Sequence, residues 1–274
     1  MTEHVTRLGL LQIGHGQPLA LIAGPCVIES REHTLRMADA IGRLCRQRQI
    51  PFVFKASFDK ANRSSIDSFR GPGPTDGLPI LAEVRRELDI PVLCDIHLPE
   101  QGQPAGEVLD CVQVPAFLCR QTDLLVAAAR TGKCVNVKKG QFMSPEEMEN
   151  VVRKIRSAGN ANVLLTERGT TFGYDSLVND FRSVPIMRQL APVAFDATHS
   201  VQQPGGGEAV TGGQRQFVPP LARAAMAAGA DALFIETHPE PDKAASDAGS
   251  QWPLDDVEAL LKVCMEIFHL AREN

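Results

Sequence analysis

The sequence predicts a single (β/α)8 TIM barrel of the α/β class, preceded by a short N-terminal hairpin. Short apolar runs rich in β-branched residues recur along all 274 residues, and most are followed by a segment with helical periodicity. No linker-like break, internal repeat or low-complexity tract separates these units. The length also suits two small domains, but eight successive β-then-α units favour one barrel over residues 1–274.

Eight segments are expected to form the barrel strands. Their nearly continuous apolar character is typical of parallel strands that are covered on both faces. They are residues 19–23, 51–55, 91–95, 111–115, 134–138, 162–166, 192–196 and 231–235. Residues 5–18 precede the first unit, and we expect residues 1–18 to contain a small hairpin that caps the bottom of the barrel.

Three of the intervening helices have clear patterns. An apolar stripe passes through Met37, Ile41, Leu44 and Cys45. A capping box at residues 144–147 predicts a second helix with Pro145 at its first position. The last helix has the apolar face Val257, Leu260, Leu261 and Cys264. The patterns after the third and sixth strands are weaker.

The composition excludes several classes of protein. A net charge of −5 gives no basic surface for nucleic acid, and no apolar run approaches the roughly 18 residues of a membrane helix. The first ten residues do not resemble a secretory signal. The seven cysteines are scattered and form no CxxC pair, which favours buried thiols in a reducing compartment. We therefore expect a cytoplasmic protein.

Polar and charged side chains follow nearly every predicted strand. Barrels place catalytic groups at the carboxyl ends of their strands, because the eight βα loops converge there. A solvated barrel edge is also polar, so some of these residues are incidental. Cations and metal-binding residues recur together at these strand ends, which we interpret as an active site. The residues are Cys26, Lys55, Asp95, His97, Gln113, Lys138, Lys139, Glu167, Arg168, Asp196, His199, Glu236 and His238.

Five cations from three βα loops form one group within this set. Converging cations without a matched carboxylate cluster repel one another unless an anion neutralises them, and phosphate suits lysine and arginine. Their spacing suggests two anionic ligands, one in the central pocket and one nearer the rim. Taken singly, Lys60 and Arg63 would be ordinary solvated charges. The group is Lys55, Lys60, Arg63, Lys138 and Arg168.

A second group offers softer ligands for one divalent metal ion. A thiolate, an imidazole and two carboxylates suit Zn2+, Fe2+ or Mn2+ better than Mg2+. The four residues are far apart in sequence, so spacing alone favours a buried structural thiol and a core histidine. The candidate ligands are Cys26, His199, Glu236 and Asp247.

Several runs closely resemble the 3-deoxy-D-manno-octulosonate 8-phosphate synthase family. They are residues 24–30 (GPCVIES), 55–65 (KASFDKANRSS), 115–123 (PAFLCRQTD), 136–139 (NVKK), 172–175 (FGYD), 196–199 (DATH) and 235–239 (IETHP). The likeness extends from about residue 20 to the C-terminal helix, and the run that begins at Lys55 is long enough to be specific.

The resemblance implies a reaction and a set of binding residues. Phosphoenolpyruvate, D-arabinose 5-phosphate and water would give the eight-carbon 2-keto sugar acid phosphate and inorganic phosphate, which serves lipopolysaccharide inner-core synthesis. Phosphoenolpyruvate would be held by Lys55, Lys138 and Arg168, with Ser57 and Gln113 nearby. The aldose phosphate would be received by Lys60, Asn62, Arg63 and Ser64, and by Arg120 across a subunit boundary of a homotetramer.

The resemblance also bears on the metal ion and on catalysis. The family has a metal-free branch with asparagine in place of Cys26, so this chain resembles the metal-dependent branch. The glycine-rich segment 202–213 looks like a lid. His97 is a candidate proton carrier or a positioning residue, and a metal ion could orient the aldehyde or activate water. The predicted catalytic residues are Lys60, Asn62, His97 and Lys138.

Two alternatives stay open at this point. An aromatic-pathway synthase joins phosphoenolpyruvate to erythrose 4-phosphate on a related barrel, but its lysine run typically reads closer to Lys-Pro-Arg-Thr-Ser. A non-catalytic barrel that only binds a sugar phosphate would need the cations but not the four metal ligands. Because the fold would be shared with the first alternative, the decision rests on the site.

Overall fold

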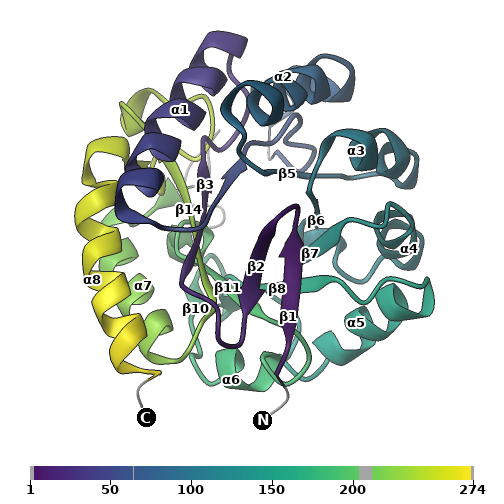
Figure 1. Ribbon diagram of the computed structural model, residues 1–274, viewed down its shortest axis with the longest axis vertical. Coiled ribbons are helices and arrows are strands. Elements are labelled where there is room, and N and C mark those ends of the chain that lie inside the picture. The colour runs from purple at the N-terminus through teal and green to yellow at the C-terminus, as the bar shows by residue number, and fades with distance from the viewer. Residues whose placement is uncertain (1–2, 64, 204–211, 273–274) are drawn as a thin grey trace.

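The computed structural model describes residues 3–63, 65–203 and 212–272, and it shows a closed eight-stranded parallel barrel inside a ring of helices (Figure 1). The strand order is β11-β8-β7-β6-β5-β4-β3-β14, and β14 also pairs with β11 to close the barrel. The strands are β3 (Ala20–Gly24), β4 (Phe52–Lys55), β5 (Val92–Asp95), β6 (Cys111–Val114), β7 (Cys134–Lys138), β8 (Val163–Glu167), β11 (Val193–Asp196) and β14 (Ala232–His238). The predicted TIM barrel is therefore confirmed.

The interior of the barrel has an apolar half and a polar half. Alternate residues of each strand face inward. Near the amino ends of the strands, these inward residues form a fully buried cluster that includes Val53, Leu93, Cys111, Leu164 and Ala194. Two positions further along the same strands, the side chains are polar and still buried: Lys55, Asp95, Gln113, Thr166 and Asp196. Polar groups are thus concentrated at the carboxyl end of the barrel.

A hairpin closes the amino end of the barrel, as predicted. Strand β1 (Val5–Leu8) pairs antiparallel with β2 (Leu11–Gly14), and Figure 1 shows the hairpin across the barrel opening. Leu8 and Ile13 are fully buried in the inner apolar cluster. The hairpin is fastened by Asn162, whose Oδ1 accepts hydrogen bonds from the Thr6 hydroxyl and the Arg7 amide at 2.5 and 2.7 Å.

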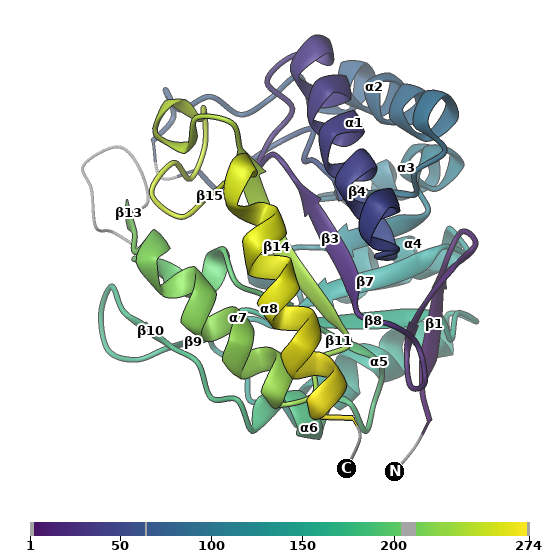
Figure 2. The same cartoon turned by 60° about the vertical axis from the view of Figure 1, so that its left-hand side comes forward.

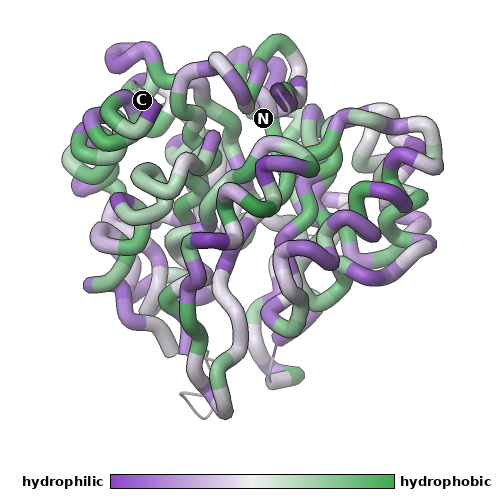
Figure 3. The backbone as a smooth tube through the Cα atoms, turned by 90° about the horizontal axis from the view of Figure 1, so that it is seen from below, coloured by the Kyte–Doolittle hydropathy of each residue, from purple (hydrophilic) through white to green (hydrophobic). Residues whose placement is uncertain are grey.

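Eight helices of the described chain pack around the strands. A second apolar cluster fills the space between strands and helices. Hydrophobic and hydrophilic stretches alternate along the helices, as an amphipathic ring requires (Figure 3). Helices α7 and α8 lie side by side along one flank of the barrel (Figure 2). The helices are α1 (Arg31–Arg48), α2 (Gly73–Leu88), α3 (Gly102–Val108), α4 (Thr122–Arg130), α5 (Met148–Ser157), α6 (Ser183–Met187), α7 (Val218–Ala227) and α8 (Val257–Leu270).

Three helices differ in start or length from a regular predicted helix. The capping box is present, because the Ser144 amide donates to Glu147 and the Glu147 amide donates to the Ser144 hydroxyl. However, α5 begins at Met148, so Pro145 is not its first residue. The intervening amides bond three residues back, as with Met148 to Pro145, which makes this turn tighter than an α-helix. Helices α3 and α6, where the patterns were weak, have only 7 and 5 residues.

Short strands decorate the carboxyl end. β9 (Thr170–Thr171) pairs with β10 (Leu177–Val178), and β15 (Trp252–Pro253) pairs with the end of β14. This last pairing extends β14 to His238, so Glu236 and His238 lie within a strand and not after it. β12 (Gln202–Gln203) pairs with β13 (Gly212–Gly213) at the two ends of the glycine-rich segment, whose residues 204–211 lie outside the described chain.

Candidate active site

A cavity of about 190 Å3 opens at the carboxyl ends of the strands. It brings together residues that the sequence analysis assigned to separate loops. Ten of the predicted site residues line it: Lys55, Lys60, Asn62, Arg63, His97, Gln113, Lys138, Arg168, His199 and Asp247. The convergence that the barrel prediction required is therefore present.

The cations that follow β4 have carboxylate partners. Lys55 Nζ lies 2.5 Å from Glu236 Oε1, and Lys60 Nζ lies 3.7 Å from the same oxygen. Arg63 Nη1 lies 3.8 Å from Asp247 Oδ1. Burial alone would raise the pKa of Glu236, but Lys55 and Lys60 hold it well below its ordinary value. The expectation that the cations lack matched carboxylates was therefore wrong for this loop, because carboxylates from β14 and the loop after it reach them.

The two deeper cations differ from each other. Lys138 Nζ lies 2.6 Å from Asp196 Oδ2 and 4.0 Å from the centre of the Phe234 ring. The guanidinium of Arg168 has no carboxylate within 4 Å among the described residues; its Nη2 donates to Gln202 Oε1 at 2.7 Å, and its Nη1 has no partner there. Burial lowers the pKa of both Lys138 and Arg168. An arriving anion would relieve this cost, most of all at Arg168.

Asp196, at the end of β11, links a cation to a candidate metal ligand. Its Oδ2 accepts from Lys138 and lies 2.7 Å from His199 Nδ1, while its Oδ1 accepts the amides of Thr198 and His199. Burial alone would raise the pKa of Asp196, but His199 and Lys138 hold it well below its ordinary value. Because Asp196 occupies Nδ1, the His199 ring presents Nε2 to the site.

Three of the four predicted metal ligands form one cluster, and the fourth, His199, faces two of them. His199 Nε2 is 3.6 Å from Glu236 Oε2 and 3.8 Å from Asp247 Oδ2. Cys26 Sγ is 3.2 Å from Asp247 Oδ2. Ligand atoms of Cys26, Glu236 and Asp247 all lie within 4.8 Å of one another. The spacing of the group suits a single ion bound between β3, β11, β14 and the loop that follows β14.

The chemistry of this group also fits a divalent cation. Glu236 Oε2 is buried without a hydrogen-bond partner among the described residues, although it faces His199. Burial, reinforced by Asp247 and Glu236, raises the pKa of the Cys26 thiol well above its ordinary value. A thiolate at this position therefore needs a cation beside it, and a thiolate with an imidazole and carboxylates suits Zn2+, Fe2+ or Mn2+.

The end of β5 positions the predicted proton carrier. His97 Nε2 lies 3.0 Å from Asp95 Oδ2, and Ser57 donates to Asp95 Oδ1 at 2.5 Å. His97 Nδ1 is buried without a partner in the described chain, and His97 lines the cavity. Ser57 does not line the cavity; it is fully buried and supports Asp95.

The structure adds residues that the sequence analysis did not single out. Gln141, Gln202 and Phe117 line the cavity. Lys139, which the sequence analysis named among the strand-end residues, does not line the cavity: it is fully buried and donates to Met143 O at 3.2 Å and Thr170 Oγ1 at 3.0 Å, which ties two loops together. Lys139 was visible as the second lysine of the NVKK run, whereas no sequence pattern marks the two glutamines.

Arg120 does not line the cavity of its own chain. Arg120 is exposed and lies beside α5, where its carbonyl accepts from Lys154 at 2.9 Å. This position leaves the predicted contact across a subunit boundary untested. Ser64 lies outside the described residues.

The fold and the cavity together define a TIM-barrel enzyme that acts on anionic substrates. The sequence profile of the DAHP synthetase I family matches residues 5–273. Proteins named 2-dehydro-3-deoxyphosphooctonate aldolase from Geobacter sp. (strain M21) and Desulfosudis oleivorans are 58% and 55% identical to this chain. The alignments cover 96% and 100% of this chain, and 96% and 99% of those proteins. The chain therefore belongs to the DAHP synthetase I family, among the 2-dehydro-3-deoxyphosphooctonate aldolases.

A relative from Cyanothece sp. (strain PCC 7425) carries the same name and is 57% identical over 94% of both chains. 2-Dehydro-3-deoxyoctonate phosphate and 3-deoxyoctulosonate phosphate are two names for one class of 2-keto sugar acid. The resemblance recognised in the sequence is therefore confirmed. The described chain has no helix that is long and apolar enough to cross a membrane.

Proposed function

We propose that this chain condenses phosphoenolpyruvate with D-arabinose 5-phosphate and water. The products are 3-deoxy-D-manno-octulosonate 8-phosphate and inorganic phosphate, and the sugar acid serves lipopolysaccharide inner-core synthesis. The printed names of the relatives support this product, rather than that of the aromatic-pathway alternative. The structural observation that carries the proposal is one cavity lined by Lys55, Lys60, Arg63, Lys138 and Arg168.

The cations supply two positions for anions. Lys138 is the last residue of β7 and Arg168 directly follows the neighbouring strand β8, and we assign both to phosphoenolpyruvate. Lys60, Asn62 and Arg63 follow β4, and we assign them to the phosphate of the aldose. Binding of the two anions at these separate positions holds the reacting carbons of the two substrates close together, which lowers the entropic part of the activation barrier.

The reaction forms one carbon–carbon bond and releases phosphate. Carbon 3 of phosphoenolpyruvate attacks the aldehyde carbon, and water adds to carbon 2. The aldehyde oxygen takes up a proton, and the resulting hemiketal phosphate collapses to the ketone. His97 is positioned to exchange a proton through Nδ1, because its Nε2 faces Asp95. Lys138 and Arg168 hold the phosphate while carbon 2 reacts.

We further propose that Cys26, His199, Glu236 and Asp247 hold one divalent ion, Zn2+, Fe2+ or Mn2+. The Glu236 Oε2 atom, which has no hydrogen-bond partner among the described residues, and the orientation of His199 support this assignment. Such an ion can polarise an aldehyde or lower the pKa of a bound water.

We also propose that the protein is a homotetramer in the cytoplasm. Large apolar side chains are exposed on the loops that follow the consecutive strands β6, β7 and β8, where a neighbouring subunit would cover them: Phe117, Phe142, Phe172 and Tyr174. Arg120 belongs to the first of these loops. Seven cysteines without a disulfide support a reducing compartment.

The decisive experiment measures phosphate release from phosphoenolpyruvate with arabinose 5-phosphate, with erythrose 4-phosphate and with no aldose, before and after chelation. We expect release with arabinose 5-phosphate alone, and loss of release in chelator. Release with erythrose 4-phosphate would favour the aromatic-pathway synthase. Binding of both substrates without release would favour the non-catalytic barrel.

A further inference from the structure

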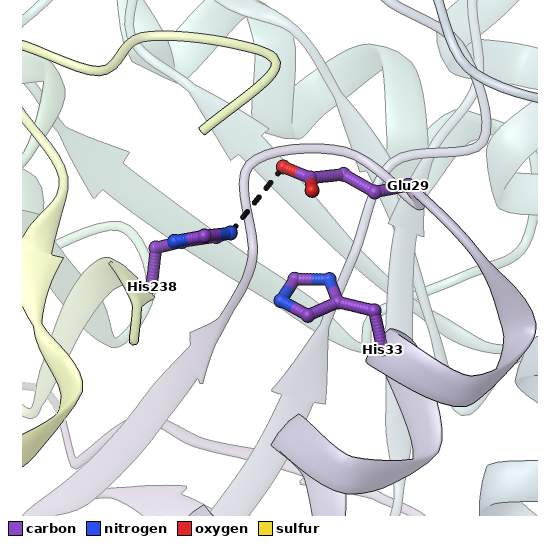
Figure 4. A group of neighbouring side chains, drawn as sticks. All are labelled: Glu29, His33 and His238. Atoms are coloured by element: carbon purple, nitrogen blue, oxygen red, sulfur yellow. Dashed lines mark ion pairs between the residues drawn. The ribbon is translucent and has the colours of Figure 1, made fainter. Parts of the chain in front are cut away.

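A second group of potential ligands lies outside the barrel wall, next to the candidate active site. Glu29, His33 and His238 place their ligand atoms within 4.8 Å of one another, and Figure 4 shows the three side chains facing a common centre. His238 Nε2 lies 3.6 Å from Glu29 Oε1, and the two imidazole ring centres are 4.8 Å apart. Both histidines are about 93% buried, since each is 7% exposed.

The hydrogen bonds of His238 argue against a metal ion here. His238 Nδ1 accepts the backbone N–H of Glu240 at 3.0 Å, so the proton of the neutral ring is on Nε2. Nε2 is the nitrogen that faces Glu29, and a metal ligand needs a free lone pair there. Histidines that bind metals normally donate from the other nitrogen, which is the reverse of what His238 does. The described contacts of this group therefore do not favour a bound metal ion.

The same residues hold the loop that follows β14 at two points. His238 holds the beginning of this loop through the Glu240 amide. Glu29 holds its middle, because Glu29 Oε1 accepts the amide of Ala245 at 3.0 Å. The carbonyl of Ala245 accepts from Arg63 Nη2 at 3.0 Å. Both the amide and the carbonyl of Ala245 are thus hydrogen-bonded to side chains, two residues before Asp247.

Asp247 needs such support more than the other three candidate ligands. Glu236 is part of β14, and Cys26 and His199 come within three residues of the ends of β3 and β11. Asp247 lies instead on the loop, with a backbone φ of 49°, which is unfavourable for a residue other than glycine. A loop that relaxed from this conformation would move the carboxylate away from Cys26 Sγ, now 3.2 Å from Asp247 Oδ2.

We propose that Glu29 is a positioning residue that sets the place of Asp247 through its hydrogen bond to the Ala245 amide. The inference rests on the proposed metal site, whose ligands Glu29 does not include. Hydrogen-bonding partners that orient metal ligands typically change metal affinity by about 10–100-fold when they are removed. The bond needs an acceptor oxygen at Glu29, but it does not need a negative charge.

The test is a titration of the purified metal-free protein with Co2+, followed by the thiolate-to-Co2+ absorption band that Cys26 would produce. Glu29→Ala should weaken Co2+ binding by about 10–100-fold. Glu29→Gln should retain affinity near that of the wild type, because its amide oxygen still accepts from Ala245. His33→Leu is the matched control: His33 nitrogens make no hydrogen bond within the described chain, so the affinity should not change.

Four results would overturn the inference. Wild-type affinity in Glu29→Ala would show that Asp247 needs no such support, and the proposed metal site would still stand. Equal weakening in the Ala and Gln variants would point to the charge of Glu29 and not to its hydrogen bond. Two bound ions in the wild type and one in His33→Leu would show that the outer group is itself a metal site. A wild-type protein without the thiolate band would instead remove the proposed metal site, and this inference with it.

Discussion

Replacing Arg168 with methionine should raise the stability of the ligand-free protein and weaken its binding of phosphoenolpyruvate. Arg168 is 4% exposed, its guanidinium has no carboxylate within 4 Å in the described chain, and its Nη1 has no partner there. A buried cation in this situation is held in place by the rest of the fold at a cost in free energy. Methionine has a similar length and no charge, so it removes the cost without opening a large cavity.

The substitution changes both the free energy of unfolding and the free energy of phosphoenolpyruvate binding. Replacing buried charges by apolar groups of similar volume stabilises proteins by about 1–4 kcal/mol. On the binding side, each charge-assisted hydrogen bond contributes about 1.5–3 kcal/mol. If the guanidinium donates two such bonds to phosphoenolpyruvate, the KM for this substrate should rise by roughly two to four orders of magnitude.

Thermal unfolding with and without phosphoenolpyruvate measures both effects in one experiment. Without ligand, Arg168→Met should melt at least about 2 °C above the wild type. At a ligand concentration of about 100 times the wild-type Kd, the wild type should gain about 2.7 kcal/mol, whereas the variant should gain at most about 0.4 kcal/mol at the same concentration. Arg182→Met is the control, because Arg182 is exposed and pairs only locally with Asp180. It should change neither result.

This prediction would be refuted by a variant that melts below the wild type without ligand, since the Arg168 side chain would then stabilise the ligand-free protein. It would also be refuted by a variant that phosphoenolpyruvate still stabilises fully. In that case the anion would sit on other cations of the cavity.

Four further outcomes are expected. Chelation should remove about one divalent ion per chain by elemental analysis, and Cys26→Ala should retain none; a fully active metal-free protein would contradict this. Arg63→Ala should raise the KM for the aldose phosphate roughly 10–100-fold and leave that for phosphoenolpyruvate nearly unchanged, whereas equal effects would contradict two anion positions. Phosphoenolpyruvate labelled with 18O at the bridging oxygen should deliver the label to inorganic phosphate, and label in the sugar acid would mean phosphorus–oxygen cleavage. Asp196→Asn should lower the free energy of unfolding by about 3–5 kcal/mol at pH 7 in denaturant titrations. Because the folded pKa of Asp196 is depressed, this difference should shrink as the pH falls below about 4; a constant difference would contradict the role of its charge.

The strands could be predicted because buried parallel strands are continuous apolar runs. The small errors have a physical cause. Three predicted strands begin at Pro51, Pro91 and Pro192, whereas β4, β5 and β11 each begin one residue later. Proline has no N–H to donate to the sheet, yet the carbonyls of all three still accept hydrogen bonds from neighbouring strands.

The candidate site was predictable as a set of residues but not as a set of pairs. The barrel fold alone requires that strand ends meet, so the cations and the metal ligands could be expected in one cavity. Which carboxylate serves which cation depends on side-chain reach across the barrel, and no pattern announces that Asp196 contacts both Lys138 and His199. The bond from the Ala245 amide to Glu29 joins residues 216 positions apart and leaves no local signal.

The division of the barrel interior bears on how such a protein can change over evolutionary time. Its amino half is filled by apolar residues such as Val53 and Leu93 and is closed by Leu8 and Ile13. This half offers almost no group that could contact a substrate. Its carboxyl half contains the reactive groups. Mutations that trade one aliphatic side chain for another in the amino half can therefore accumulate without altering specificity. Conversely, the loops and strand ends can be remodelled for a different sugar while the apolar amino half of the barrel is inherited intact.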